Sequence, residues 1–83
     1  MNLYACSYDH EDWICYVFAE TRGKAKHLFN KFCGGDSDVF VDVRSNFIGK
    51  SNIVEIPTVV DCESHKDYPA VLALGGGYES EVG

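Results

Sequence analysis

Two apolar runs near the start of the chain are separated by a short polar stretch. Residues 3–8 (LYACSY) and 13–19 (WICYVFA) are rich in β-branched and aromatic side chains, and residues 9–12 (DHED) lie between them. Such runs, divided by a few polar residues, predict two antiparallel strands joined by a four-residue hairpin loop.

The pairing of these strands decides which side chains share a face of the sheet. If Tyr8 faces Trp13 across the loop, Cys6 faces Cys15 on the same side. Both faces of this hairpin then carry mostly apolar groups. One face must meet a helix, and the other is covered either by the C-terminal part of the chain or by another protein.

The apolar pattern takes a helical period after residue 20. Thr21 is a suitable N-cap, and Gly34 suits the left-handed position that ends a helix. Side chains spaced i, i+3, i+4 and i+7 form one apolar stripe: Ala25, Leu28, Phe29 and Phe32. This spacing predicts a helix over about residues 21–33.

The second half of the chain predicts shorter elements. Residues 39–44 (VFVDVR) alternate strictly, as in a half-buried strand, and residues 49–52 (GKSN) predict a turn. Residues 53–60 (IVEIPTVV) form another extended run, in which Pro57 requires an edge strand or a break. A short helix is expected over about residues 67–74, before a run of three glycines.

The predicted order of elements is β-β-α-β-β, with a short C-terminal helix. It defines an α+β fold in which a small, mostly antiparallel sheet carries one amphipathic helix on a face. A chain of 83 residues is one domain. We expect residues 1–75 to form this domain and residues 76–83 to be a flexible C-terminal tail.

Charge is distributed unevenly along the chain, whose net charge is −6. Four of the seven basic residues lie in the predicted helix, which contains no acidic residue: Arg22, Lys24, Lys26 and Lys31. The rest of the chain holds three basic residues against all thirteen acidic ones. Direct binding to nucleic acid is therefore not expected. The basic helix is either a solvated face or a surface that contacts a partner.

The acidic hairpin loop is a second candidate contact surface. Asp9, Glu11 and Asp12 lie between the large aromatic side chains of Tyr8 and Trp13. Aromatic groups with a charged rim are typical of protein interfaces. An acidic surface can also occupy a basic groove on an enzyme that acts on nucleic acid. The alternative is that the C-terminal segment packs over these aromatic groups.

Four residues are candidates for a structural zinc site: Cys6, Cys15, Cys62 and His65. Only the last two have a ligand-like spacing, and nothing in the sequence brings them close to the first two. Buried free thiols are the favoured interpretation, and no cofactor is expected. The chain has no catalytic motif, so we expect that it is not an enzyme.

The chain has no recognisable signal peptide and no apolar run long enough to span a membrane, so a cytoplasmic location is expected. In a reducing cytoplasm the thiols need not pair. A homodimer or larger homo-oligomer, formed through the second apolar face of the hairpin, is a further possibility.

Two stretches carry a resemblance to known sequences. YVFAETRGKAKHLF, residues 16–29, is followed by VFVDVRSNFIG, residues 39–49. Over residues 3–49 the chain resembles very short reading frames common in phages and prophages of Gram-positive bacteria. This resemblance implies a non-enzymatic accessory, inhibitory or counter-defence role in a bacterial host cell, with a host protein as the partner. It transfers no site residues.

Overall fold

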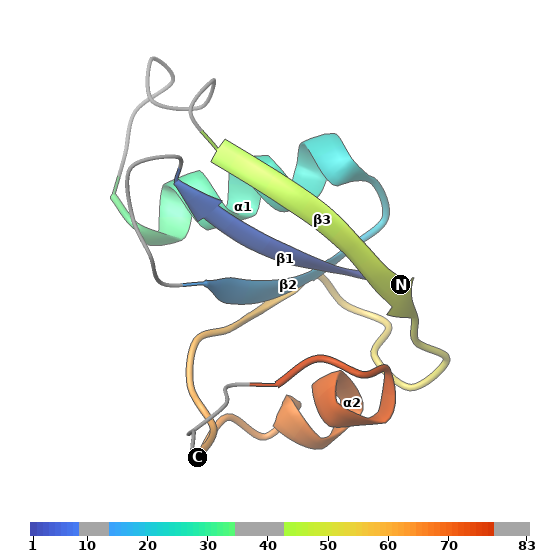
Figure 1. The fold of residues 1–83 in the computed structure, drawn as a ribbon. Coiled ribbons are helices and arrows are strands. Elements are labelled where there is room, and N and C mark those ends of the chain that lie inside the picture. Colours follow the sequence, from blue (N-terminus) through green and yellow to red (C-terminus); the bar gives the residue numbers. More distant parts are fainter. Residues whose placement is uncertain (9–13, 35–42, 78–83) are drawn as a thin grey trace.

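The computed structural model describes residues 1–8, 14–34 and 43–77. The elements follow the order β1 (Asn2–Tyr8), β2 (Cys15–Ala19), α1 (Arg22–Phe32), β3 (Val43–Lys50), β4 (Thr58–Val60) and α2 (Tyr68–Ala73) (Figure 1). The predicted α+β class and the predicted order of elements are confirmed.

The described residues form a four-stranded antiparallel sheet in the order β3-β1-β2-β4. Cys6 pairs with Cys15 and Tyr4 with Val17, as the hairpin pattern predicts. The expected pair of Tyr8 with Trp13 lies outside the described residues. Helix α1 carries the chain across β1, from β2 on one side to β3 on the other.

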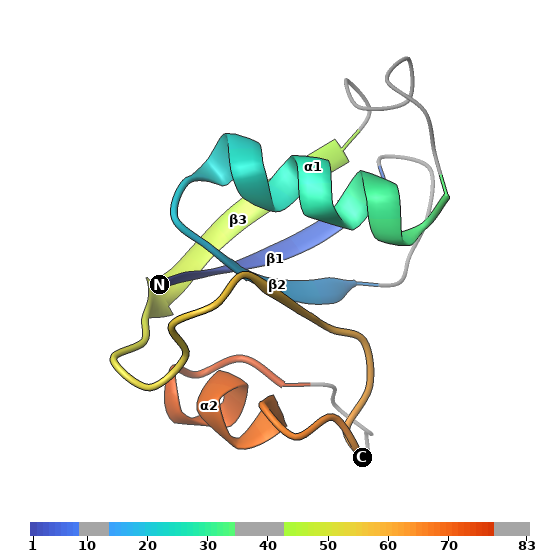
Figure 2. The ribbon, with the colours of Figure 1, turned by 180° about the vertical axis from the view of Figure 1, so that it is seen from behind.

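The sheet lies between the two helices, with α1 on one face and α2 on the other (Figures 1 and 2). We call the buried group beneath α1 the α1-side cluster: Tyr4, Cys6, Tyr8, Cys15, Val17, Ala19, Ala25, Phe29 and Val43. The α2-side cluster consists of Leu3, Ala5, Tyr16, Phe18, Val54, Val60, Ala70 and Val71.

The chain's own C-terminal part therefore covers the second apolar face of the hairpin. Leu3 and Phe18 are fully buried there, against Val60 and Val71. The alternative that another protein covers this face is wrong. The same burial corrects the surface predicted for self-association, because this face is not open to a second copy, while the homodimer itself stays a prediction.

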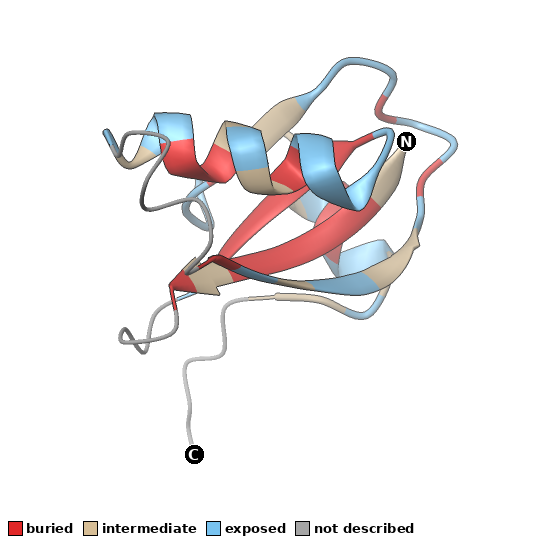
Figure 3. Cartoon of the chain, turned by 90° about the horizontal axis from the view of Figure 1, so that it is seen from above, coloured by how far each residue is buried: buried red, intermediate tan, exposed pale blue. Residues whose placement is uncertain are grey.

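Helix α1 begins and ends as the sequence predicts. The hydroxyl of Thr21 accepts a hydrogen bond from the backbone N–H of Lys24 at 3.2 Å, and Gly34 has a φ of 78°. The predicted apolar stripe is only partly right, because Phe32 is 50% exposed. Asn30, which is not part of the predicted stripe, is buried instead. The Asn30 side chain accepts a hydrogen bond from the Tyr8 hydroxyl at 2.8 Å, which allows this polar group to be buried. Figure 3 shows buried segments alternating with exposed ones along α1.

Strand β3 differs from the strand predicted at residues 39–44. It runs from Val43 to Lys50, and residues 39–42 lie outside the described residues. The glycine predicted to open a turn, Gly49, instead belongs to the strand. A Cβ atom there would lie 3.3 Å from the Leu74 side chain, so this glycine allows a close approach of the C-terminal part.

Pro57 has the predicted effect on the next extended run. Strand β4 begins immediately after it and contains only Thr58–Val60, at the edge of the described sheet. Residues 53–57 are not in a strand. The first two of these residues, Ile53 and Val54, donate their backbone N–H groups to the Ser51 hydroxyl.

The end of the described chain is packed against α2. Gly76 donates its N–H to the Val71 carbonyl at 3.1 Å, and the Tyr16 hydroxyl donates to the Gly77 carbonyl at 3.0 Å. Gly76 and Gly77 therefore belong to the folded domain, which corrects the boundary predicted at residue 75. Residues 78–83 of the predicted tail lie outside the described residues.

Candidate protein-interaction surface

The acidic loop predicted as a contact surface is only partly described. Asp9, Glu11, Asp12 and Trp13 lie outside the described residues. Tyr8 is 8% exposed, its hydroxyl donates to Asn30, and its ring centroid lies 5.0 Å from that of Phe29. Tyr8 thus belongs to the packing between the sheet and α1, and its assignment to the contact surface is corrected.

The four cations predicted to form a second surface lie on two sides of α1. Lys24 and Lys31 are seven residues apart and share the outward face of the helix, where both are exposed. Arg22 and Lys26 are four residues apart and lie on another side. Lys26 is half-buried and close enough to Cys6 to interact electrostatically with its thiol.

The outward face of α1 is cationic and little neutralised. His27 is exposed between Lys24 and Lys31, and the helix contains no acidic residue. Lys24 pairs with Glu20 at 2.7 Å, and this hydrogen bond and charge hold the pKa of the Glu20 carboxyl below its usual value. No acidic group of the described part of the chain forms an ion pair with Lys31.

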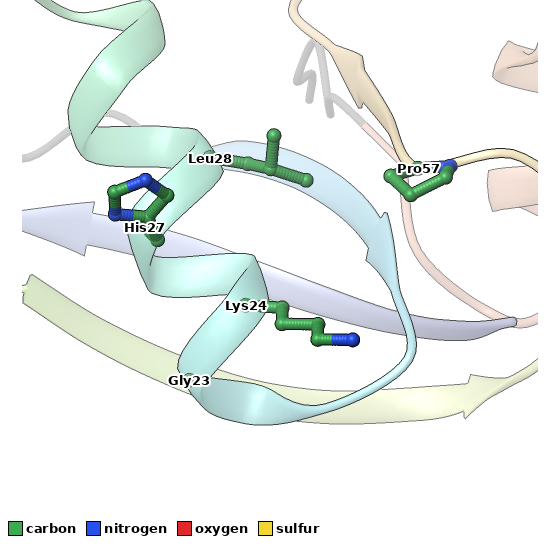
Figure 4. Close-up of a pocket in the computed structure, with 5 residues that line it drawn as sticks. All are labelled: Gly23, Lys24, His27, Leu28 and Pro57. Atoms are coloured by element: carbon green, nitrogen blue, oxygen red, sulfur yellow. The ribbon is translucent and has the colours of Figure 1, made fainter.

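A shallow groove adjoins this face, between α1 and the segment that precedes β4. Its volume is about 300 Å³, and four of its lining residues come from α1, Gly23, Lys24, His27 and Leu28, with Pro57 as the fifth. Figure 4 shows the Leu28 and Lys24 side chains extending from the helix toward the side on which Pro57 lies. The groove therefore has an apolar floor with cationic and imidazole groups beside it.

A second groove of about 320 Å³ lies around the segment between β3 and β4. Ile53 and Ile56 line it and are 73% and 71% exposed. Its charged residues are of both signs: Glu55, Lys66 and Asp67. Apolar side chains this exposed mark a second possible contact, but the mixed charge gives no preference for the sign of a partner.

The structure does not gather the proposed zinc ligands. The four cysteines, all of which are described, are free thiols. Cys6 and Cys15 are buried beneath α1, whereas Cys62 is exposed beside Ser64 and His65 accepts a hydrogen bond from the Asp67 N–H. Within the described ranges no three His, Cys, Asp or Glu side chains could hold a metal ion, so the set of Cys6, Cys15, Cys62 and His65 is wrong.

Burial also makes the Cys6 thiol unreactive. Loss of hydration raises its pKa from 9.0 to about 11, although the Ser45 hydroxyl and Lys26 partly counteract this rise. A thiol with so high a pKa is almost entirely protonated at neutral pH and is a poor nucleophile.

Sequence reasoning identified the basic helix but not the groove beside it. The helical spacing predicts that Leu28 belongs to the buried stripe, and Pro57 indicates only a strand edge or a break. Their proximity depends on the pairing of β4 with β2, which brings residue 57 close to α1. No local signal in the sequence encodes this contact.

Comparisons of the chain with known protein families, curated proteins and solved structures gave no match. In the described residues no helix is long and apolar enough to cross a membrane.

Proposed function

We propose that this chain is a small non-enzymatic module that binds another protein. The observation that carries the proposal is the outward face of α1, where Lys24 and His27 line an apolar groove and Lys31 lies farther along the same face. An apolar centre with a polar, charged rim is the usual composition of a protein interface. The cationic groups favour a partner that is acidic at the point of contact.

The chemistry of the described part supports binding rather than catalysis. The Cys6 thiol is buried and protonated, and the groups of Cys62 and His65 are engaged in local hydrogen bonds. A nucleophile needs an adjacent base and access to substrate. The groove beside α1 offers one imidazole and one ammonium group, and its described lining residues include no carboxylate or hydroxyl.

The resemblance to short phage and prophage proteins favours a protein of the bacterial host as the partner, and a cytoplasmic site of action. In that setting the chain would act stoichiometrically, as an inhibitor or in counter-defence. The loop residues Asp9, Glu11, Asp12 and Trp13 would supply a second contact, of opposite charge to α1. An enzyme that acts on nucleic acid would offer a basic groove for that loop.

Affinity capture from a bacterial lysate, with quantitative mass spectrometry, tests this proposal. The tagged chain is compared with a Lys24→Glu/Lys31→Glu variant and with a Lys50→Glu/Lys66→Glu variant. The second variant changes the net charge equally, at exposed positions outside α1. We expect one stoichiometric protein partner, lost with the α1 variant and retained with the control.

A further variant tests the loop, through Asp9→Asn, Glu11→Gln, Asp12→Asn and Trp13→Ala together. Loss of the partner in this variant as well would assign both surfaces to the interface. The proposal is overturned if no stoichiometric partner is recovered. It is also overturned if capture is unchanged by the α1 variant and the loop variant alike.

A further inference from the structure

We infer that the groove between α1 and Pro57 binds an acidic segment of the partner protein, which inserts one apolar side chain between Leu28 and Pro57. This inference rests on the proposed function and specifies the chemistry of the segment recognised. It follows from the shape of the groove, the charge beside it and the rigidity of its two walls.

The size of the groove suits a single side chain. Its volume of about 300 Å³ lies at the lower limit of the range of about 300–1,000 Å³ that small-molecule sites occupy. Leu28 is half-buried and packs below against the α1-side cluster, so its position is fixed from beneath. Opposite it, the pyrrolidine ring of Pro57 restricts the backbone. An inserted apolar group would meet two preformed walls.

The charges beside the groove select an acidic occupant. Lys24 lines the groove, and Lys31 lies two turns along the same face of α1. Lys24 is engaged with Glu20, but both side chains are mostly exposed. Exposed ion pairs contribute little to stability, so Lys24 can exchange this partner for another carboxylate. A segment with acidic residues on both sides of an apolar one matches this arrangement.

Nucleic acid fits this groove less well than an acidic peptide. Phosphate binding requires an excess of clustered cations, whereas the whole chain has a net charge of −6. The described lining of the groove contains no Phe, Tyr or Trp on which a base could stack, and the His27 imidazole is a smaller platform. The experiment includes an oligonucleotide as a competing ligand, to test this preference for an acidic peptide over nucleic acid.

The test is a titration of the full isotope-labelled chain, followed by nuclear magnetic resonance. The probe is acetyl-Asp-Glu-Leu-Glu-Asp-amide, compared with the same peptide containing serine in place of leucine. We expect amide shifts at Gly23, Lys24, His27 and Leu28, and an affinity at least about tenfold lower for the serine peptide, because the buried leucine contributes most of the binding.

Two tryptophan variants form a matched pair. Asn52→Trp places the ring at an exposed position outside the groove, so this variant should bind the leucine peptide within about twofold of the wild type. Gly23→Trp should fill the groove and weaken binding by at least about tenfold. Pro57→Ala, on the opposite wall, is a second variant in case the tryptophan perturbs folding, which the melting temperature would reveal.

Three results would overturn the inference. The first is a set of shifts outside the groove, the second is equal binding of the leucine and serine peptides, and the third is a thymidine oligonucleotide that binds the groove more tightly than the peptide. Failure of the inference can be told apart from failure of the proposed function. If Gly23→Trp still captures the lysate partner in the same amount, the groove is not used but the chain is a protein-binding module.

Discussion

The two faces of the sheet are covered in different ways. Helix α1 has eleven residues and is capped by the Thr21 side chain, and the cluster beneath it includes two thiols and the Tyr8–Asn30 hydrogen bond. Helix α2 has six residues, and its N-cap, Asp67, makes no capping hydrogen bond through its side chain to any described residue. The cluster on that side is almost wholly apolar.

The two helices are thus stabilised differently: α1 mainly by local features of its own sequence, and α2 by contacts with residues far away in the chain. Helix α1 has the length, caps and periodicity of an independent element. Helix α2 is too short to persist alone and depends on the burial of Val71 against residues at the start of the chain. Its face of the sheet is therefore a structural support, which leaves the exposed side of α1 as the better candidate for binding.

The largest expected effect comes from removing one aromatic ring from each cluster. Phe18 and Phe29 are both fully buried, on opposite faces of one sheet. We expect Phe18→Ala and Phe29→Ala each to lower the free energy of unfolding by about 3–5 kcal/mol, in urea titrations followed by circular dichroism. A Phe18→Ala variant with an unchanged midpoint would contradict the packing of α2 on the sheet.

The next largest effect is a loss of stability at alkaline pH. It arises on the α1 side of the sheet, where the Cys6 thiol is buried. Above pH 9 the unfolded chain loses the Cys6 proton, whereas the folded chain retains it until about pH 11. The unfolded state is therefore favoured as pH rises through this window, and stability should fall by up to about 2–3 kcal/mol. Urea titrations from pH 8 to pH 11 measure this loss.

The control for this pH dependence is a pair of cysteine variants. Cys6→Ala should reduce the alkaline loss relative to the wild type, while Cys62→Ala should leave it unchanged because Cys62 is exposed. An identical alkaline slope in the wild type and Cys6→Ala would show that the Cys6 thiol is not buried as described.

The smallest effect contrasts two glycines. A Cβ atom on Gly76 would lie 2.9 Å from both the Tyr16 ring and the Val71 side chain, whereas one on Gly23 would meet open space. We expect Gly76→Ala to destabilise the fold by about 1–3 kcal/mol. Gly23→Ala should stabilise it by about 0.5–1 kcal/mol, because alanine favours the helix. Equal melting temperatures of these two variants would contradict the close packing around α2.

The contrast between local and long-range contacts also explains which parts of the fold could be predicted from the sequence. The Cys6–Cys15 register and the limits of α1 follow from patterns within a few residues, and both are confirmed. The sequence predicts a turn at Gly49 because Leu74, whose close approach requires the glycine, lies 25 positions away. The sequence leaves the coverage of the second sheet face open for the same reason.

The candidate site shows the same limit of sequence reasoning. Basic residues at helical spacing predicted a cationic helix, but not that Lys26 turns toward Cys6 while Lys24 and Lys31 face outward. The sequence places Tyr8 in a contact surface because the hydrogen bond to Asn30 has no local signature. The groove requires α1 and Pro57 to meet across β2 and β4.

The surface that we propose for contact with a partner protein is the outward face of α1, rather than the α2 side. The most direct measurement is a titration of the isotope-labelled chain with the partner recovered by affinity capture, followed by nuclear magnetic resonance. We expect amide signals to change most at residues 23–31 and around Pro57. Changes concentrated at residues 68–74 of α2, with α1 unaffected, would contradict it.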